Sequence, residues 1–331
     1  MITYPNVKVN LGLSVLRKRS DGYHELETLF VPYFGMHDTL EIISGDDFSR
    51  TSASLFERYS IFGDTEVPEL PAPENRATLG IVRGGDPSLL GGGPAEQDVF
   101  RGGTTPDGGS RIRQSIRNDG KVMITIARAE GVDWEPLEDL TVKAYGLLDK
   151  EFGLPPVKIF LEKTSPVGAG LGGGSADAAF ALKMLSELFA LGLDADALAE
   201  RAARLGSDCA FFIHNRPMFG TGRGEILEPC DIDLSPWELR VSVPAGVRVG
   251  TADAYRGITP REAAACRALP LREALSRPVA QWRGRLVNDF EPTVFAKFPA
   301  IAAAKQAMYD AGAIYASMSG SGSAVYGLFP K

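Results

Sequence analysis

A glycine-rich segment near the middle of the chain constrains its fold more than any other feature. Residues 165 to 179 are SPVGAGLGGGSADAA, and five of these fifteen residues are glycine. Apolar residues then recur at the i, i+3, i+4, i+7 spacing of one helix face, at Ala178, Ala181, Leu182, Leu185, Leu188 and Phe189. The pattern predicts a glycine loop that leads directly into the N-terminus of a helix.

Such a loop is suited to binding phosphate. Glycine tolerates positive φ and lets a ligand approach the backbone closely. The first N–H groups of a helix lack internal partners and carry partial positive charge, so they bind anions. A plain flexible connection is the alternative, but three consecutive glycines before a small-residue helix are costly to order in a linker.

The loop matches neither of the two common nucleotide motifs. A Walker loop ends in Gly-Lys-Ser/Thr, whereas here Ser175 follows Gly174 directly. The dinucleotide fingerprint needs an acidic residue about twenty positions on, and Glu187 comes too early and within the helix. We therefore interpret the segment as a mononucleotide triphosphate loop of a third kind.

Length and charge narrow the class of protein. The 331 residues suffice for two domains, and the formal net charge of −7 argues against nucleic acid as the main partner. No apolar stretch is long enough to span a bilayer, and the N-terminus is neither a signal nor a transit peptide. The three cysteines and three histidines are too scattered for a disulfide framework or a zinc site. We expect a cytoplasmic protein with reduced thiols that does not bind membranes.

The first strand carries a candidate catalytic lysine. Apolar residues from Val7 to Val15 alternate with polar or small ones, which places Lys8 and Asn10 on one face. An ordinary solvated lysine is the alternative for Lys8. The Asp21-Gly22 pair predicts a hairpin, after which Tyr23 and His24 stand at the start of a second strand. This pair could stack on and hydrogen-bond an aromatic base, or simply cover the sheet edge, and the sequence leaves both open.

The elements on either side of the glycine loop are also predicted. A strand over 38–43 is followed by an irregular stretch, with ten glycines and three prolines between residues 80 and 110. We expect a mobile insertion at about 52–118, because this composition cannot offset its ordering entropy. A strand at 121–126, a helix at 137–152 and a strand at 157–161 then lead to the loop.

An aspartate and a second glycine-serine loop lie downstream of the glycine loop. A helix over 197–205, capped by Asp194 or Asp196, ends at Gly206, and Asp208 then precedes a short apolar run that should be core. Helix capping is the common use of aspartate in that place. The alternative is a reactive carboxylate at the edge of a buried element. Residues 318 to 324, MSGSGSA, precede the final strand at 325–329.

Together these segments resemble the GHMP small-molecule kinase superfamily. The strand with Lys8, the loop Pro166 to Ala176 and the loop Met318 to Ala324 are similar to its three motifs. The finer resemblance is to the branch that acts on a cytidine diphosphate-linked methylerythritol. It is carried by residues 6–13, 21–24, 170–175, 205–208, 246–255 and 288–291, and covers nearly all of the chain except roughly 52–118.

The resemblance implies an α+β fold with the two-domain GHMP kinase architecture. The expected N-terminal domain, residues 1–235, is ribosomal-S5-like, and the expected C-terminal domain, residues 236–331, is ferredoxin-like. The implied activity is transfer of phosphate from ATP to the 2-hydroxyl of the methylerythritol in the non-mevalonate route to isoprenoids. The resemblance implies a small-molecule substrate, no nucleic-acid or membrane partner, and a cytoplasmic monomer or homodimer.

The resemblance also assigns roles to individual residues. Asp208 is implied as the catalytic carboxylate and Lys8 as its partner, and Mg²⁺ accompanies ATP with Ser175 as a candidate ligand. The substrate side is implied to involve Asn10, Tyr23, His24 and, in a stretch that aligns less closely, Thr251 and Tyr255. The ATP-binding residues are implied to be Pro166, Val167, Gly168, Ala169, Gly170, Leu171, Gly172, Gly173, Gly174, Ser175 and Ala176.

Two positions depart from the family pattern. Ala176 stands where serine is usual, which costs a phosphate or metal contact, and Asp139 stands where an adenine-contacting asparagine is frequent. Two other functions are open. One is a GHMP kinase for homoserine or a mevalonate-like alcohol, which would have no use for a base-stacking Tyr23-His24 pair. The other is a nucleotide-binding sensor without turnover, which would have no need for both Lys8 and Asp208.

Overall fold

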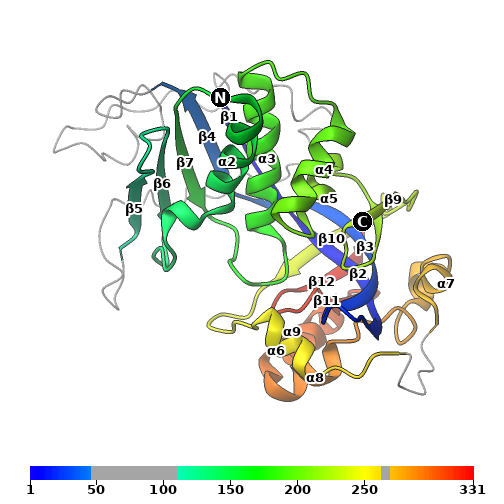
Figure 1. The fold of residues 1–331 in the computed structure, drawn as a ribbon. Coiled ribbons are helices and arrows are strands. Elements are labelled where there is room, and N and C mark those ends of the chain that lie inside the picture. The colour runs from blue at the N-terminus through cyan, green and yellow to red at the C-terminus, as the bar shows by residue number, and fades with distance from the viewer. Residues whose placement is uncertain (46–109, 262–268) are drawn as a thin grey trace. The chain divides into compact units, whose positions relative to one another are not determined.

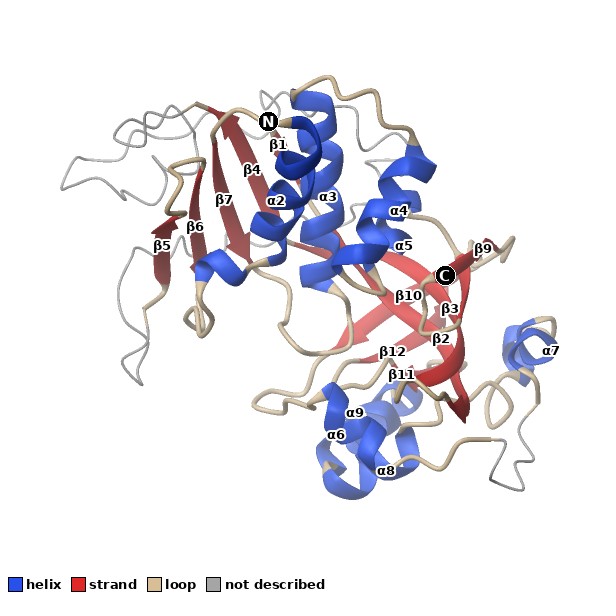
Figure 2. Ribbon diagram, viewed as in Figure 1, coloured by secondary structure: helices blue, strands red, loops and turns tan. Residues whose placement is uncertain are grey.

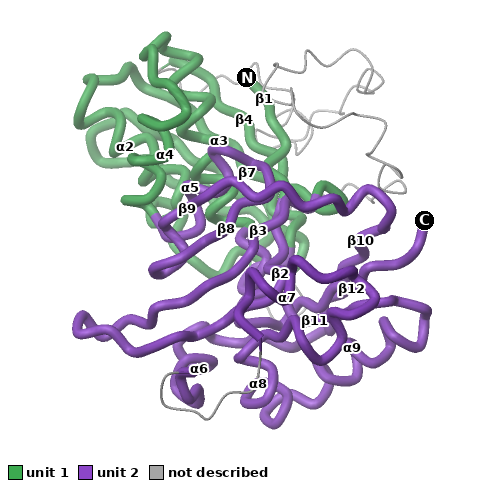
Figure 3. The backbone as a smooth tube through the Cα atoms, turned by 90° about the vertical axis from the view of Figure 1, so that its right-hand side faces the viewer, with its two compact units in different colours: residues 1–6, 34–165, 173–205 green, residues 7–33, 166–172, 206–331 purple. Residues whose placement is uncertain are grey.

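The structure, a computed structural model, describes residues 1–45, 110–261 and 269–331. The described residues contain both helices and strands, as expected for an α+β protein (Figure 2). The described residues form two compact units, shown in Figure 3. Unit 1 contains residues 1–6, 34–165 and 173–205, and unit 2 contains residues 7–33, 166–172 and 206–331. The glycine loop passes from unit 2 to unit 1 between Gly172 and Gly173.

Unit 1 is built on a five-stranded sheet with the order β1-β4-β7-β6-β5 (Figure 1). The neighbouring strands β6 and β7 are parallel, and every other neighbouring pair is antiparallel. The strands are β1 (Ile2–Thr3), β4 (Thr39–Ser44), β5 (Ile112–Ile116), β6 (Val122–Arg128) and β7 (Val157–Lys163). Strand β6 is buried along its whole length, as expected for a strand inside a sheet covered by helices.

Three helices complete the described part of unit 1. Helix α2 (Leu140–Phe152) follows the 3-10 turn η4 (Pro136–Glu138) and connects the parallel strands β6 and β7. Helix α3 (Gly173–Leu188) packs against α2, α4 (Ala195–Leu205) and β4. Helix α2 begins after Asp139, whose side chain accepts the N–H of Thr141, and ends at Gly153 in the left-handed region with φ 66°.

Unit 2 contains two further sheets. In the four-stranded sheet β2-β3-β8-β9, the hairpin predicted at Asp21-Gly22 joins the first two strands. Its strands are β2 (Asn6–Lys18), β3 (His24–His37), β8 (Met218–Thr221) and β9 (Ile226–Pro229), and the ends of β2 and β3 at residues 6 and 34–37 belong to unit 1. The second sheet has the antiparallel order β10-β12-β11, formed by β10 (Trp237–Ser242), β11 (Tyr315–Met318) and β12 (Val325–Pro330).

Short helices surround these sheets in unit 2. Helix α9 packs against β11 and β12, and α8 packs against α9. The helices are α5 (Cys209–His214), α6 (Thr251–Arg256), α7 (Leu271–Leu275), α8 (Glu291–Lys297) and α9 (Pro299–Asp310), with a 3-10 turn η5 (Val279–Gln281). One core cluster joins Leu13 and Val15 of β2 to Phe290, Ile301 and Val325.

The structure corrects the predicted extent of the insertion at its C-terminal end. Residues 110–118 contain strand β5, in which Ile112 pairs with Ala127 and Ile116 with Met123. The expected irregular structure is therefore wrong there, because pairing with β6 satisfies the backbone groups of a segment with few apolar residues. The remainder of the insertion, up to residue 109, lies outside the described residues. The domain boundary expected between residues 235 and 236 stays a prediction.

Candidate active site

Strand β2 presents a buried lysine, with only 4% of its side chain exposed. The Nζ atom of Lys8 donates to Asn10 Oδ1 at 2.6 Å and to the carbonyl of Gly170 at 3.0 Å, and it lies 3.3 Å from Asp208 Oδ2. The backbone N–H of Lys8 donates to the carbonyl of Leu171 at 2.9 Å. The solvated-lysine alternative is therefore wrong, because three oxygen atoms from separate segments of unit 2 replace water around the ammonium.

Asp208 immediately precedes helix α5 but does not cap it. Its side chain makes no capping hydrogen bond, although the residue occupies the cap position. The carboxylate faces Lys8 instead and keeps 27% of its side chain exposed. The capping alternative is thus wrong. A carboxylate paired with a buried cation on one side and open on the other can accept a proton from a bound hydroxyl.

Asn10 fixes the lysine from the same face of β2. Its amide nitrogen donates to Thr28 Oγ1 at 3.0 Å, which leaves the amide oxygen directed at Lys8. The Asn10 backbone N–H donates to Ser319 Oγ at 3.2 Å. The structure therefore shows a positioning contact of Asn10 with Lys8, while the expected contact with substrate stays a prediction.

The first half of the glycine loop, Pro166 to Gly172, requires its glycines. Gly168, Gly170 and Gly172 have φ of 73°, 76° and 73°, in the region that side chains rarely adopt. A Cβ on Gly170 would also collide with the backbone oxygen of Ser319. The loop can therefore lie against the second glycine-serine loop only with glycine at this position.

The second half of the loop forms the start of helix α3 in unit 1. Gly173 and Gly174 are its first residues, and Ser175 is partly exposed, whereas Ala176 is fully buried. A Cβ on Gly174 would meet no atom within 4 Å. Gly174 therefore borders open space at the start of α3, where helix N–H groups can bind an anion.

The segment Asn288-Asp-Phe-Glu291 supports the second glycine-serine loop. The amide nitrogen of Asn288 donates to the carbonyls of Met318 and Gly320, both at 2.8 Å, and its oxygen accepts the N–H of Phe290 at 3.0 Å. Glu291 Oε1 accepts the N–H of Met318 at 2.9 Å. These contacts explain the motif, to which the sequence alone assigned no physical role.

Aromatic side chains gather at the start of β3. The ring of His24 stacks on that of Tyr255 from α6, with centroids 4.9 Å apart and planes 21° apart. Tyr255 also makes an edge contact with Phe290 at 4.8 Å. Tyr23 is 57% exposed, and the guanidinium of Arg223 lies 5.0 Å from its ring centroid. Arg223 lies in the turn between β8 and β9 and was not among the predicted site residues. The exposed Tyr23 keeps one face of its ring available to a ligand.

Two titratable groups in this aromatic cluster have shifted pKa values. Burial, with a smaller contribution from Lys18, lowers the pKa of His24 below its ordinary value of 6.5. Burial and the nearby charge of Asp208 raise the pKa of Tyr255 to about 12. Both rings are therefore neutral at pH 7. The remaining predicted residue, Thr251, begins α6 and has its hydroxyl 3.4 Å from that of Ser321, in the second glycine-serine loop.

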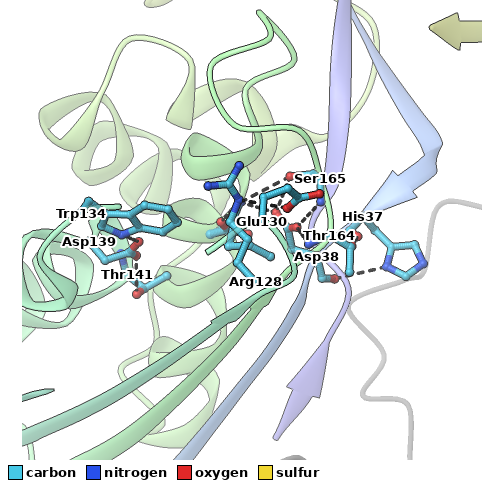
Figure 4. Close-up of polar contacts among 11 residues, drawn as sticks. His37, Asp38, Arg128, Glu130, Trp134, Asp139, Thr141, Thr164 and Ser165 are labelled. Carbon is cyan, nitrogen blue, oxygen red and sulfur yellow. Dashed lines mark hydrogen bonds and ion pairs between the residues drawn. The ribbon is translucent and has the colours of Figure 1, made fainter. Parts of the chain in front are cut away.

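Asp139, at the place of an adenine-contacting asparagine, is engaged within unit 1. Its Oδ1 accepts the N–H of Thr141 at 2.9 Å and the Thr141 hydroxyl at 2.7 Å, and its Oδ2 accepts the indole N–H of Trp134 at 3.2 Å. Figure 4 shows these three side chains together. The carboxylate thus caps α2 and orients the indole.

Three features of the part of the chain that the structure describes concern metal ligands, membrane-spanning helices and cysteines. Within it, no three His, Cys, Asp or Glu side chains are grouped so as to hold a metal ion. Every described helix is too short or too polar to cross a membrane. Cys209 and Cys230 are thiols, and Cys266 lies outside the described residues.

Comparison with known proteins defines the class. The family models described as GHMP kinases N terminal domain and GHMP kinases C terminal match residues 139–216 and 271–331. The loop, the paired lysine and aspartate and these matches identify an ATP-dependent small-molecule kinase with the GHMP fold. A homoserine kinase from Cytophaga hutchinsonii shares this fold, with a TM-score of 0.51 and 15% identity over 99% of this chain and 86% of that one.

The finer family follows from closer relatives. A 4-diphosphocytidyl-2-C-methyl-D-erythritol kinase from Bacteroides fragilis is 39% identical over 99% of this chain and 92% of its own length. A solved 4-(cytidine 5'-diphospho)-2C-methyl-D-erythritol kinase has a TM-score of 0.62 and 28% identity over 99% of this chain and 90% of that one. The chain belongs to the 4-diphosphocytidyl-2-C-methyl-D-erythritol kinase family of GHMP kinases.

Proposed function

We propose that this kinase transfers the γ-phosphoryl group of ATP to the 2-hydroxyl of 4-diphosphocytidyl-2-C-methyl-D-erythritol, the cytidyl substrate, with Asp208 as the general base. The observation that carries the role of Asp208 is its pairing with Lys8 at 3.3 Å. The choice of substrate rests on the names of full-length relatives. Homoserine and mevalonate kinases share the fold at low identity, and so they support no substrate.

Asp208 has one chemical role in the proposed reaction, the acceptance of a proton. The substrate hydroxyl oxygen forms a bond to the γ-phosphorus while the bond from phosphorus to the β–γ bridging oxygen breaks, which releases ADP. Asp208 accepts the hydroxyl proton as the oxygen–phosphorus bond forms. General-base catalysis of this kind contributes a rate acceleration of about 10²-fold to 10⁴-fold. Lys8 fixes the direction of the carboxylate, because its own position is held by Asn10 and Gly170. Most of the remaining acceleration comes from positioning and charge neutralisation.

ATP is proposed to bind along the continuous stretch Pro166 to Ala176. The support is the row of positive-φ glycines and the open space at Gly174, since a glycine-rich loop at a helix N-terminus is suited to binding phosphate. Ser175 supplies the hydroxyl in this stretch.

The residues present fit an Mg²⁺ ion that arrives with ATP. Mg²⁺ commonly takes one or two protein oxygens together with substrate phosphates and water, and the partly exposed Ser175 offers such an oxygen. Ala176 adds none. When bound, the ion would neutralise charge that develops on the phosphate oxygens.

The cytosine is proposed to bind beside the aromatic cluster. Neutral His24 can donate from one ring nitrogen and accept at the other, and the exposed ring of Tyr23 offers a stacking face. Tyr255 supports His24 by stacking. Asn10 and Thr251 complete the set of residues proposed to contact the substrate. We propose a small-molecule partner rather than nucleic acid, which the net charge of −7 supports. We also propose that the enzyme is cytoplasmic and that it is a monomer or homodimer.

A competition assay tests this proposal. Steady-state ADP release is measured with the cytidyl substrate, homoserine and mevalonate in parallel, each at fixed ATP and Mg²⁺. We expect turnover with the cytidyl substrate and competitive inhibition by cytidine diphosphate. Turnover with homoserine or mevalonate, or inhibition by uridine diphosphate as strong as by cytidine diphosphate, would contradict it. Binding of ATP with no turnover of any alcohol would favour the sensor.

A further inference from the structure

A buried group of three charges lies at the base of the glycine loop, within unit 1. It consists of Asp38, Lys163 and Asp177, whose side chains are 0%, 4% and 2% exposed. Lys163 Nζ donates to Asp38 Oδ2 and, at 2.6 Å, to Asp177 Oδ2. None of these residues belongs to the proposed catalytic pair or to the predicted ATP-binding stretch. We call the three residues the Asp–Lys–Asp cluster.

The fold brings together the two sides of the glycine loop at this cluster. Lys163 ends β7, and Asp38 directly precedes β4, whose first residue Thr39 pairs with Glu162. Asp177 lies on α3, four residues after its first residue. The ammonium of Lys163 therefore links β7, which precedes residues 166–172 of the glycine loop, to α3, which follows them.

Asp38 also fixes the backbone at the start of the loop. Its Oδ1 accepts the N–H of Thr164 at 2.8 Å and the N–H of Ser165 at 2.7 Å, and its Oδ2 accepts the Ser165 hydroxyl at 2.7 Å. Figure 4 shows Asp38 beside these two residues. One carboxylate thus holds two successive peptide groups immediately before Pro166.

The first residue of α3 packs directly against the same group. A Cβ on Gly173 would collide with Ser165 Oγ and would lie 3.3 Å from Lys163 Nζ and 3.5 Å from Asp38 Oδ2. The helix can therefore begin here only because residue 173 is glycine. The start and the end of the loop are each in contact with the cluster.

Stability alone explains this arrangement poorly. Burial by itself lowers the pKa of a lysine, but Asp177 and Asp38 outweigh it and raise the pKa of Lys163 above its ordinary value. Taking such charges out of water is costly, and well-packed apolar residues often serve as well. Asp177 Oδ1 is moreover buried without a hydrogen-bond partner among the described residues. A group retained at this cost is better explained by the geometry that it imposes.

We propose that the Asp–Lys–Asp cluster is a positioning device that holds both ends of the glycine loop in the conformation that binds the ATP phosphates. This inference rests on the proposed binding of ATP along that loop. The cluster touches no reacting atom and acts through the backbone of residues 164–165 and the start of α3.

The test compares Asp177→Asn with Asp149→Asn. The Asp177→Asn substitution keeps the shape of the side chain but replaces the carboxyl group that Lys163 contacts with an amide. Asp149 is a matched control, because it also bridges two opposite charges in unit 1, Arg117 and Lys121, at 3.0 and 2.7 Å. The readouts are thermal unfolding, the equilibrium Kd for ATP by calorimetry, the KM for each substrate, and amide hydrogen exchange over residues 164–177.

A positioning role predicts a selective effect on ATP. Asp177→Asn should raise the Kd and KM for ATP by about tenfold or more, as small misplacements of a binding group do. It should leave the KM for the cytidyl substrate within about twofold and speed exchange over residues 164–177. Asp149→Asn should lower thermal stability and leave the Kd for ATP unchanged. If folded Asp177→Asn binds ATP as tightly as the wild type, the cluster is only structural and the inference is wrong.

A milder variant serves if Asp177→Asn does not fold. Ser165→Ala removes the hydroxyl that Asp38 accepts and leaves the three charges in place. It should raise the Kd for ATP by about two- to threefold, and an unchanged Kd would overturn the inference. Failure of the proposed function has a different signature, since the wild type would then bind no ATP or would not phosphorylate the cytidyl substrate.

Discussion

Lys8 Nζ and Asp208 Oδ2 lie 3.3 Å apart, although 200 residues separate them in the chain. The two residues meet because β2 and the segment before α5 belong to the same compact unit. The lysine is nearly inaccessible to water, and its direction is set by Asn10 and by the carbonyl of Gly170. The carboxylate is the exposed partner, which is the arrangement that a base acting on a bound alcohol requires.

The first prediction concerns Asp208. Asp208→Asn keeps the size of the side chain and removes its ability to accept a proton. We expect kcat to fall by about 10²-fold or more, the usual share of a general base, while the KM for ATP changes by less than about threefold. Asp310→Asn at the exposed end of α9 is the control and should keep kcat within about twofold. A kcat for Asp208→Asn close to that of the wild type would remove the residue from the mechanism.

The second prediction distinguishes the roles of two glycines of the loop, Gly174 and Gly170. Gly174→Ala places a methyl group in open space at the start of α3, so thermal stability should be unchanged or slightly higher. The methyl group would occupy the space proposed for a phosphate, and the KM for ATP should rise by about tenfold or more. Gly170→Ala should instead destabilise the fold, because φ is 76° and the new Cβ collides with Ser319.

Thermal unfolding and ATP titration of the two variants provide the measurement. A Gly174→Ala protein with unchanged KM for ATP would show that phosphate does not approach this part of the backbone. A Gly170→Ala protein as stable as the wild type would show that the close contact between the two glycine loops is not required.

The third prediction is a pKa for His24. Burial and Lys18 lower this pKa, so His24 should titrate below 6.5 in the folded protein. The unfolded chain then takes up a proton at higher pH than the folded one does. Stability should therefore be complete above about pH 6.5 and should decrease as the pH falls below it, until the folded protein is also protonated.

An NMR titration of the labelled histidines measures this pKa, with His24→Gln to assign the signal. Lys18→Gln should move the midpoint upward by less than burial lowers it, because burial is the larger cause. A wild-type midpoint above 6.5 would contradict the described packing of His24 on Tyr255.

The fourth prediction concerns the support of the second glycine-serine loop. Asn288→Asp replaces an amide that donates to the carbonyls of Met318 and Gly320 with a carboxylate that repels them. We expect a loss of about 1–3 kcal/mol in the free energy of unfolding, because two buried carbonyls lose their donor. Urea unfolding measures it, with Asp289→Asn next in the chain as a comparison that breaks the pair with Arg261 instead. Equal stability of Asn288→Asp and wild type would refute the supporting role.

Local patterns in the sequence predicted much of the fold. The alternation of β2 placed Lys8 and Asn10 on one face, and the structure confirms it with a hydrogen bond of 2.6 Å. The predicted helix over 137–152 is also confirmed, although it begins later, at Leu140, because Asp139 caps it. Strand β5 was missed because its few apolar residues give no clear alternation.

Contacts between distant segments could not be predicted from such patterns. Nothing near Asp208 distinguishes a capping aspartate from a partner of Lys8, since only the fold brings the two together. Thr28, which orients Asn10, is one of several polar residues on β3. The Asp–Lys–Asp cluster could not be predicted for the same reason, because 125 residues separate Asp38 from Lys163.

Following the phosphorus atoms during the reaction tests the proposed phosphoryl transfer. The purified protein is incubated with ATP, Mg²⁺ and the cytidyl substrate, and ³¹P NMR records the products. We expect ATP to be replaced by ADP, and a new phosphomonoester signal, assigned to the 2-hydroxyl, to grow at the same rate. No such signal is expected with homoserine or mevalonate. An unchanged ATP spectrum, or a phosphomonoester on either of those alcohols, would contradict the proposal.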